Sequence, residues 1–404
     1  MKICMLAYSF YESDARIRQY ATALVQRGDD VEVIALRRAG SCRQETINGV
    51  RVVRIQGRLV TEHHRITYLF KIVCFLFHAA AVLAWRQLRD GYNLVHVHSV
   101  PDFLVFAALV PRLCGVPVIL DIHDLLPELY AGKFGNRRSG AFQLLVMVEK
   151  LSAAFADHVI VANDIWRERL ISRSVRTEKC STVRNYPDLT LFRPRSRRNG
   201  NGKFLIVYPG SLNWHQGVDI AICAFTSVAD QLGDAEFHIY GEGASKPSLE
   251  SLVQQLAMQE KIVFHSKLPV QQIAEIMADA DIAIEPKRTK SLFGTEALSM
   301  KILEFMAAGV PVIASATAVH RYYYDDSLVQ YFHDDSAEEL GACILYLKEC
   351  RDFGTTLVEN GLAYVRENNW AVKSTEYLRI VDGLISSFPA DAREVVGENA
   401  VTHP

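Results

Sequence analysis

Two glutamates, Glu296 and Glu304, lie in the stretch GTEALSMKILEFMAAG, residues 294–309. Ser299 is a suitable helix N-cap, the residues after it have helical apolar spacing, and Gly309 suits the left-handed residue that ends a helix. The pattern therefore predicts Glu296 on a loop and Glu304 about one turn inside a helix. A helix N-terminus favours an anion such as phosphate, and ionised carboxylates accept hydrogen bonds from hydroxyls. This stretch predicts a site for a phosphorylated, hydroxyl-rich ligand.

The elements that would position this site are short apolar runs alternating with longer helical patterns. The candidate strands cover residues 2–7, 31–36, 50–55, 94–98, 117–122 and 158–162, then 204–210, 235–241, 261–265, 281–286 and 311–315. This alternation predicts an α/β protein whose parallel sheets are covered by helices. With 404 residues and a basic, Gly- and Asn-rich stretch near the middle, two doubly wound, Rossmann-like domains are expected. Ligands in such sheets bind outside the carboxyl ends of the strands.

The net charge of −2 conceals an uneven distribution. Residues 1–200 contain 29 Lys and Arg against 18 Asp and Glu, whereas residues 201–404 contain 15 against 28. A basic half can contact anionic lipid, although ordinary solubility charge explains it equally well. The longest apolar run, residues 72–85, is shorter than the roughly 18 residues that span a bilayer. We expect a helix packed in a core, with docking on a membrane surface as the alternative.

Several functional classes lack their signatures in this sequence. None of the eight cysteines forms a C-x-x-C pair, and no histidine or carboxylate spacing indicates a metal site. The phosphate-binding P-loop and the G-x-G-x-x-G dinucleotide motif are both missing. We therefore expect no metal and no cofactor, no nucleic-acid partner, and a reducing, cytoplasmic location.

The order of several motifs resembles that of a known family. The two glutamates followed by MAAG-V-P-V-I, together with YGEG (240–243), ADADIAIEP (278–286), VRNYPDLTLF (183–192) and NNWAVKSTEYLRIVDGL (368–384), are similar to the retaining family 4, group 1 glycosyltransferases. This resemblance covers nearly the whole chain. It implies the GT-B fold, in which two Rossmann-like domains face a cleft and a C-terminal helix crosses back to the first domain.

The resemblance also implies an acceptor-binding domain at 1–190, a donor-binding domain at 204–368 and a crossover helix at 369–387. Composition indicates a linker at 191–203, which is basic and rich in Gly, Asn and Pro, and a disordered tail at 388–404, which is polar.

The family's motifs assign roles to individual residues. By resemblance, Glu304 binds the ribose of the donor nucleotide, Glu296 faces the donor sugar near the reacting carbon, and His123, after a buried strand, lies near the same sugar. Asp14, Arg16 and His98 are candidate acceptor contacts, although Arg16 could equally belong to an exposed helix face. The implied contacts to the nucleotide-sugar donor are Gly210, Ser211, Gln216, Gly241, Gly243, Lys287, Arg288, Lys301 and Glu304.

One part of the sequence departs from the family pattern. The family usually places an Arg and a Lys on the first loop of the second domain, where this chain has Ser211 and Gln216. A diphosphate leaving group develops negative charge, so cations must come from elsewhere. Lys287 and Arg288 are the expected replacements, with Lys301 near the diphosphate. The rival interpretation is that the missing pair marks an inactive or altered enzyme.

The sequence therefore predicts a retaining, metal-independent glycosyltransferase. It would move a sugar from a UDP- or GDP-type donor to an acceptor hydroxyl in polysaccharide or glycolipid biosynthesis, and the acceptor would be a glycan or a lipid-linked sugar. Peripheral contact with an anionic membrane, at the inner face of the plasma membrane, is a separate expectation. The alternatives are a nucleotide-sugar epimerase of the same fold, which needs no acceptor, and a sugar-nucleotide binder without turnover.

Overall fold

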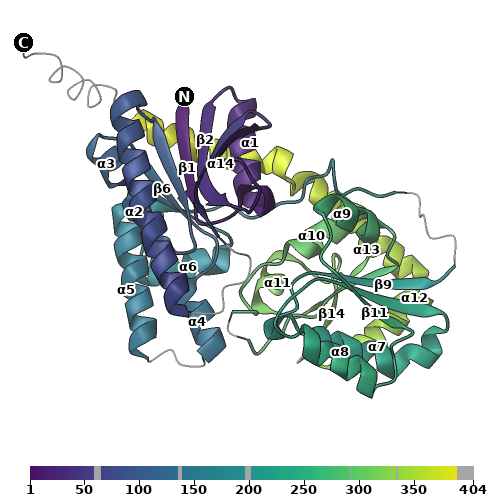
Figure 1. The fold of residues 1–404 in the computed structure, drawn as a ribbon. Coiled ribbons are helices and arrows are strands. Elements are labelled where there is room, and N and C mark those ends of the chain that lie inside the picture. Colours follow the sequence, from purple (N-terminus) through teal and green to yellow (C-terminus); the bar gives the residue numbers. More distant parts are fainter. Residues whose placement is uncertain (59–64, 135–138, 196–201, 292, 334, 389–404) are drawn as a thin grey trace, which may run out of the picture. The chain divides into compact units, whose positions relative to one another are not determined.

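The computed structural model describes residues 1–58, 65–134, 139–195, 202–291, 293–333 and 335–388. The chain divides into two compact units (Figure 1): unit 1 contains Met1–Asn185 and Ser374–Pro404, and unit 2 contains Tyr186–Lys373. The boundary falls before the expected residue 190 because Tyr186 and Phe192 are buried in the core of unit 2. Parts of the expected linker and nearly all of the expected tail lie outside the described residues.

Unit 1 is built on one eight-stranded sheet with the order β3-β4-β2-β1-β5-β6-β7-β8. Its strands are β1 Lys2–Ala7, β2 Asp30–Arg37, β3 Gln44–Ile47, β4 Val50–Gly57, β5 Leu94–His98, β6 Val118–Ile122, β7 His158–Val161 and β8 Cys180–Thr182. All neighbours pair in parallel except β3 and β4, which form an antiparallel hairpin at one edge. The six strands expected from the sequence are present, and β3 and β8 are additions.

The helices of unit 1 include one that comes from the C-terminal end of the chain. They are η1 Tyr11–Ser13, α1 Ala15–Gln26, α2 Arg65–Asp90, η2 Asp102–Ala108, α3 Leu109–Leu113, α4 Leu126–Phe134, α5 Gly140–Phe155, α6 Asp164–Arg173, η3 Thr177–Lys179 and, from Ser374, α14 Trp370–Ser387. Tyr377 of α14 is fully buried, its ring centroid is 4.1 Å from that of Tyr20, and its hydroxyl is 3.0 Å from Nδ1 of His96. The expected return of the C-terminal helix to the first domain is thus present.

Helix α2 differs from the buried helix expected for residues 72–85. One face packs inward, where Ile72, Phe75, Ala79 and Leu83 are at most 4% exposed. Only 22% of its most apolar window is buried, and by length and composition alone this helix could cross a membrane. The apolar run therefore has one buried stripe, and the rest of it is partly or fully exposed.

Unit 2 contains a six-stranded parallel sheet with the order β11-β10-β9-β12-β13-β14. Its strands are β9 Phe204–Pro209, β10 Ala235–Tyr240, β11 Ile262–His265, β12 Ile282–Glu285, β13 Val312–Ser315 and β14 Gln330–Phe332. Five of them match the expected runs within two residues. Alternate residues of β9 enter two separate cores, since Ile206 packs in one and Val207 in the other. Helices therefore cover both faces of the sheet, as a doubly wound fold requires.

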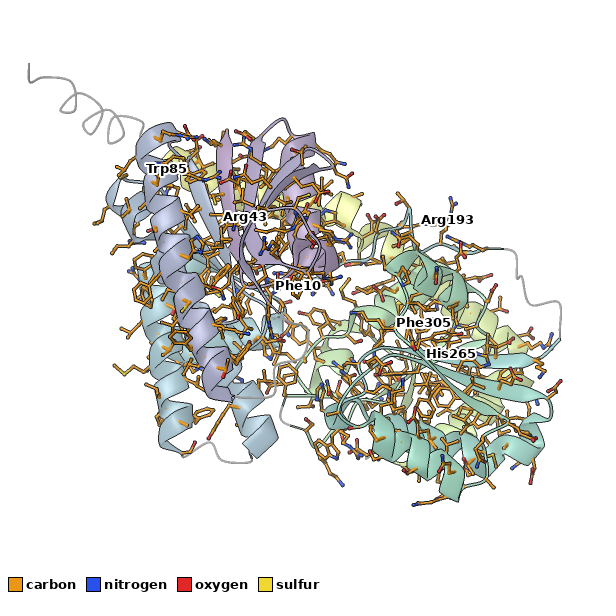
Figure 2. The ribbon with its side chains drawn as sticks, viewed as in Figure 1. Phe10, Arg43, Trp85, Arg193, His265 and Phe305 are labelled. Atoms are coloured by element: carbon orange, nitrogen blue, oxygen red, sulfur yellow. The ribbon has the colours of Figure 1, made fainter. Side chains whose placement is uncertain are left out.

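The helices of unit 2 are η4 Trp214–Gln216, α7 Val218–Leu232, α8 Lys246–Gln255, α9 Val270–Ala278, α10 Met300–Ala308, α11 Ala318–Tyr323, α12 Ala337–Glu349 and α13 Arg351–Glu367. Helix α10 ends at Gly309 in the left-handed conformation, as expected. Its residue Phe305, labelled in Figure 2, is 1% exposed and anchors the helix in the core.

Candidate functional site

The centre of the candidate site in unit 2 is Lys301, in the first turn of α10. Its ammonium nitrogen pairs with Oε2 of Glu285 at 2.7 Å and lies 4.1 Å from the ring centroid of Tyr208. Glu285 and Tyr208 belong to β12 and β9, so Lys301 lies at the carboxyl ends of two neighbouring strands. Burial works against the charge of Lys301, but the carboxylate of Glu285 outweighs burial and raises the pKa of Lys301. The lysine is therefore a fixed cation.

Lys301 also contacts the loop that lacks the family's usual cations. Its ammonium lies 3.5 Å from Oε1 of Gln216, whose amide nitrogen is 3.4 Å from the hydroxyl of Ser211. The same amide is 3.2 Å from Nε2 of His215. Burial and the nearby Lys287 and Lys301 lower the pKa of His215 to about 4, so this imidazole is neutral at physiological pH.

Lys287 holds the loop that carries Glu296. Lys287 is 4% exposed, and its ammonium donates to the carbonyl oxygen of Ala297, the residue after Glu296. Burial raises the pKa of Glu285, but Lys301 and Lys287 together lower it below its usual value. Two ammonium groups thus act on one buried carboxylate, and both belong to the segments around the start of α10.

The side chain of Arg288, the next residue, contacts η4 and α7. Its guanidinium pairs with Asp219 of α7 at 2.5 Å and donates to the carbonyl of Trp214 at 3.1 Å. The charge of Arg288 is therefore already neutralised by a carboxylate. Lys287 and Arg288 were expected to act together, yet the structure gives them different partners.

The two glutamates occupy the places that the sequence predicts. Glu296 lies on the loop before α10 and is 7% exposed, and Glu304 lies one turn inside that helix. Glu304 is partly buried and accepts no hydrogen bond from any residue that the structure describes. Burial raises the pKa of Glu304 to about 7, with Lys301 acting in the opposite direction. Ser299 occupies the N-cap position of α10, but its side chain makes no capping hydrogen bond.

Gly210, Gly241 and Gly243 allow two loops to touch. A Cβ on Gly241 would lie 1.8 Å from the carbonyl oxygen of Gly210, and one on Gly243 would lie 2.3 Å from that of Leu212. The amide of Gly210 donates to the carbonyl of Tyr240 at 2.8 Å. These glycines therefore bring the loops after β9 and β10 together, and side chains at 241 or 243 would separate them.

Unit 1 gathers its candidate residues around Asp121, which the sequence analysis did not single out. Asp121 is fully buried in β6, and Arg16 binds both its oxygens, at 2.7 and 2.8 Å. Nδ1 of His98 and Nε2 of His123 lie 3.1 and 2.9 Å from one of these oxygens. Burial raises the pKa of Asp121, but the Arg16 guanidinium outweighs it and holds the pKa well below its usual range.

This arrangement corrects one interpretation of Arg16. Arg16 is 6% exposed, so it does not belong to an exposed helix face, and its guanidinium also donates to Val183 and Asn185. Asp14, the other candidate acceptor contact on this segment, caps α1 by accepting from the amide of Ile17. The roles of Asp14, Arg16, His98 and His123 toward a substrate stay predictions.

Among the described residues, the ligand atoms of His96, His98 and Asp121 lie close enough together to hold a metal ion. The Arg16 guanidinium already occupies both oxygens of Asp121, and its positive charge disfavours a cation there. We therefore describe this group as a buried ion-pair cluster.

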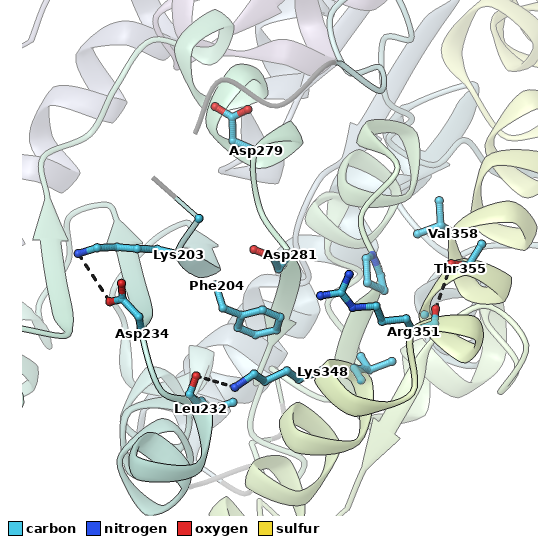
Figure 3. A pocket seen from close by; sticks show the side chains of 14 residues that line it. Lys203, Phe204, Leu232, Asp234, Asp279, Asp281, Lys348, Arg351, Thr355 and Val358 are labelled. Carbon is cyan, nitrogen blue, oxygen red and sulfur yellow. Dashed lines mark hydrogen bonds and ion pairs between the residues drawn. The ribbon is translucent and has the colours of Figure 1, made fainter. Parts of the chain in front are cut away.

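A cavity of about 660 Å³ in unit 2 lies at the amino ends of the strands, away from Lys301 (Figure 3). Its lining includes Phe204, Asp281 and Pro311, which precede or begin β9, β12 and β13. Lys348 in this cavity donates to the carbonyl of Leu232 at 2.6 Å and so binds the end of α7 (Figure 3). Because ligands in doubly wound sheets bind at the carboxyl ends, we do not place the donor here.

Comparison with known proteins agrees with this architecture. Residues 13–186 match the glycosyl transferase 4-like domain, and residues 192–363 match glycosyl transferases group 1. An uncharacterized glycosyltransferase of Methanocaldococcus jannaschii is 26% identical over 73% of this chain and 74% of its own length. A phosphatidyl-myo-inositol mannosyltransferase of Propionibacterium freudenreichii is 26% identical over 73% of this chain and 71% of its own.

The structure of sucrose-phosphate synthase from Thermosynechococcus elongatus superposes with a TM-score of 0.78 at 18% identity, covering 96% of this chain and 100% of that one. The chain spans smaller shares of other curated relatives, 61% of one and 49% of another.

The two Rossmann-like units have the GT-B fold, and the two matched domains identify the chain as a glycosyltransferase. The chain belongs to the group 1, family 4 glycosyltransferases, which confirms the resemblance found in the sequence. These matches do not favour the epimerase alternative.

Proposed function

We propose that this chain is a retaining, metal-independent glycosyltransferase. It would move a sugar from a UDP- or GDP-type donor to an acceptor hydroxyl. The observation that carries this proposal is the position of Lys301 beside Gln216, because it puts a cation next to the place where the family's lysine is missing. An active enzyme needs such a charge near the leaving diphosphate, whereas a retired site would not need to keep it.

Lys301 and Lys287 are the groups we assign to the diphosphate. Both ammonium groups influence the same buried carboxylate, Glu285, and both lower the pKa of His215. The diphosphate would bind at the start of α10, where the free backbone amides of the helix add to the positive charge. As the bond to the sugar breaks, this charge would stabilise the leaving group. Arg288 would act on the donor only if it released Asp219.

Glu304 and Glu296 would hold the hydroxyl-rich parts of the donor. An ionised Glu304 can accept hydrogen bonds from the ribose, and no described residue competes for its oxygens. Glu296 is fixed next to the sugar position by the bond between Lys287 and Ala297. In this proposal the diphosphate itself takes the acceptor's proton, while His123 contacts the sugar and Asp14, Arg16 and His98 serve the acceptor side.

We further propose that the acceptor is a lipid-linked glycan or a glycolipid. The phosphatidyl-myo-inositol mannosyltransferase has a lipid acceptor in its name and matches most of this chain. A lipid-linked acceptor would also agree with a location on the cytoplasmic face of a membrane.

The test is a thermal-shift and turnover assay with UDP-, GDP-, ADP- and dTDP-sugars, followed by NMR of the products. Stabilisation by one nucleotide series with slow hydrolysis and no epimer would support the transferase and identify the base. A changed sugar on an intact diphosphate would mean an epimerase, and no stabilisation by any donor would overturn the proposal.

The variant that tests the sugar position is Glu296→Gln. It should lose turnover by on the order of 100-fold or more while the donor-induced thermal shift persists, because the lost group acts mainly in the transition state. Full activity in this variant would contradict the role of Glu296.

A further inference from the structure

Helix α2 has a second apolar face that nothing in the described chain covers. We name this face the α2 surface and define it by Phe70, Phe77, Ala81, Trp85 and Leu88. Phe70, Phe77 and Leu88 are 67–69% exposed, and Trp85, labelled in Figure 2, is 55% exposed. At 3.6 residues per turn these positions fall on one stripe, opposite the buried stripe of Ile72 and Leu83. The stripe is about 27 Å long, from 18 steps of 1.5 Å.

The exposed apolar surface of α2 alone reaches the size of the largest patch on a typical soluble monomer. Taking about 200 Å² for each aromatic side chain, Phe70, Phe77 and Trp85 alone expose roughly 400 Å² of apolar surface. The largest patch on a typical monomer is about 300–600 Å², and larger patches mark an interaction site. Neighbouring helices add more, because α3, which packs on α2, exposes Leu109 and Leu113 at 51% and 77%.

Helix α5 continues the same pattern. Leu144, Met147 and Leu151 follow helical spacing and are 51–61% exposed. Segment η2 packs against both α2 and α5, so the helices belong to one layer of unit 1 (Figure 1). Three neighbouring helices therefore present large apolar side chains to their surroundings.

The charged residues on these helices indicate which kind of surface the apolar side chains would contact. On α2 the described side chains include three cations, Lys71, Arg86 and Arg89, and one anion, Asp90. Arg86 pairs with the buried Glu32 of β2 and Arg89 pairs with Asp90 at 2.8 Å, so the described side chains of the helix itself are net positive, but two of the three cations are already paired. On α5, Lys150 is exposed whereas Glu149 is fully buried. Apolar residues bordered by basic ones fit the interface of a bilayer with anionic headgroups. Trp85, with Arg89 packed 4.2 Å from its ring, is the kind of side chain that prefers the headgroup level.

We propose that the α2 surface docks unit 1 into the interface of an anionic lipid bilayer, with α2 lying along the membrane. Crossing the bilayer would require α2 to leave the domain, since Ile72, Phe75 and Leu83 are buried in its core. A helix with one face in the domain can insert only its other face. The link between this surface and a lipid-linked acceptor rests on the proposed function. Membrane binding itself can be measured without any glycosyl transfer.

The experiment is flotation of the full chain with vesicles of phosphatidylcholine mixed with phosphatidylglycerol, and with phosphatidylcholine alone. The protein should float with the anionic vesicles at low salt, and high salt should weaken binding without abolishing it, because apolar insertion is not screened. Brominated lipids should quench a tryptophan signal that Trp85→Phe lacks.

The double variant Phe77→Gln, Leu88→Gln should lower the partition coefficient by on the order of 10- to 100-fold. The matched control is Tyr346→Gln, which removes a side chain 46% exposed on α12 of unit 2 and should float like the wild type. Thermal unfolding by circular dichroism verifies that each variant is folded.

Three outcomes would overturn the inference: no flotation at low salt, equal flotation of the double variant, or a wild-type dimer that becomes monomeric in that variant without lipid binding. The last outcome would mean that a second copy covers the α2 surface. Flotation without transfer from any donor would count against the proposed function alone.

Discussion

The ammonium nitrogen of Lys301 lies 3.5 Å from the side-chain oxygen of Gln216, the residue that stands where related enzymes usually have a lysine. Lys301 of α10, which is 85 residues away in the chain, thus places its ammonium group beside the position where the lysine is missing. A second ammonium group at the Gln216 position would repel that of Lys301, whereas the amide oxygen of Gln216 can accept from it.

Lys301→Met should reduce kcat/KM by on the order of 100- to 1,000-fold, because a preorganised charge at the leaving group is lost. It should also lower the free energy of unfolding by about 3–5 kcal/mol, since the buried Glu285 would lose its ion-pair partner. Steady-state kinetics and urea unfolding measure the two effects.

The double variant Lys301→Met, Glu285→Gln separates these effects. It should regain most of the lost stability while turnover stays low. Recovery of turnover together with stability would show that Lys301 acts only on folding.

Lys287→Met should lower kcat/KM by on the order of 100-fold, because Lys287 fixes the loop of Glu296 and adds charge to the site. Arg288→Gln is the matched control in the next position. It breaks a partly exposed pair with Asp219, so its activity should stay within about fivefold of wild type. Equal losses in the two variants would contradict the different roles.

Glu304 should make stability depend on pH. Its pKa is about 7 in the folded protein and near 4.5 when unfolded, so between these values the native state holds more protons. The free energy of unfolding should therefore fall as pH rises from about 4.5 to about 7. Because the side chain is only partly buried, we expect a loss of roughly 1–3 kcal/mol.

Urea unfolding of wild type and Glu304→Gln at a series of pH values measures this dependence. Other groups titrate in both proteins, so the difference between the two curves isolates Glu304. The difference should grow in favour of the variant as pH rises, and parallel curves would refute the raised pKa.

Asp121→Asn should lower the free energy of unfolding of unit 1 by about 3–5 kcal/mol, because the Arg16 guanidinium would remain buried without a charged partner. Asp124→Asn, three residues later and partly exposed, is the control and should have a much smaller effect. Hydrogen exchange of β6 and α1 would locate the loss. An unchanged exchange pattern would mean that this ion pair adds nothing to the fold.

Most strands could be predicted because each central strand is an apolar run with a turn or a helical pattern after it. The strands that were missed are short and lie at sheet edges. Strand β3 reads QETI and is mostly exposed, so no apolar alternation marks it. The Asn48-Gly49 turn, with φ of 50° and 81°, was the available signal, since this dipeptide favours a hairpin.

The site could be predicted only where one local motif contains it. Glu296 and Glu304 lie on the expected loop and helix because capping and apolar spacing determine both. Asp121 and Glu285 were visible as single charges within apolar strands, but their partners come from other elements. Arg16 is 105 residues from Asp121, and only the sheet order brings them together.

The fully buried contact of Tyr377 with Tyr20 has a consequence for how the protein is made. Unit 1 begins at the first residue and is completed by a helix that follows all 188 residues of Tyr186–Lys373. At about 5–20 residues per second, a ribosome needs roughly 10–40 s to synthesise that interval. During this time the nascent first unit lacks the helix that covers Tyr20 and His96, so its core can be completed only when the end of the chain emerges.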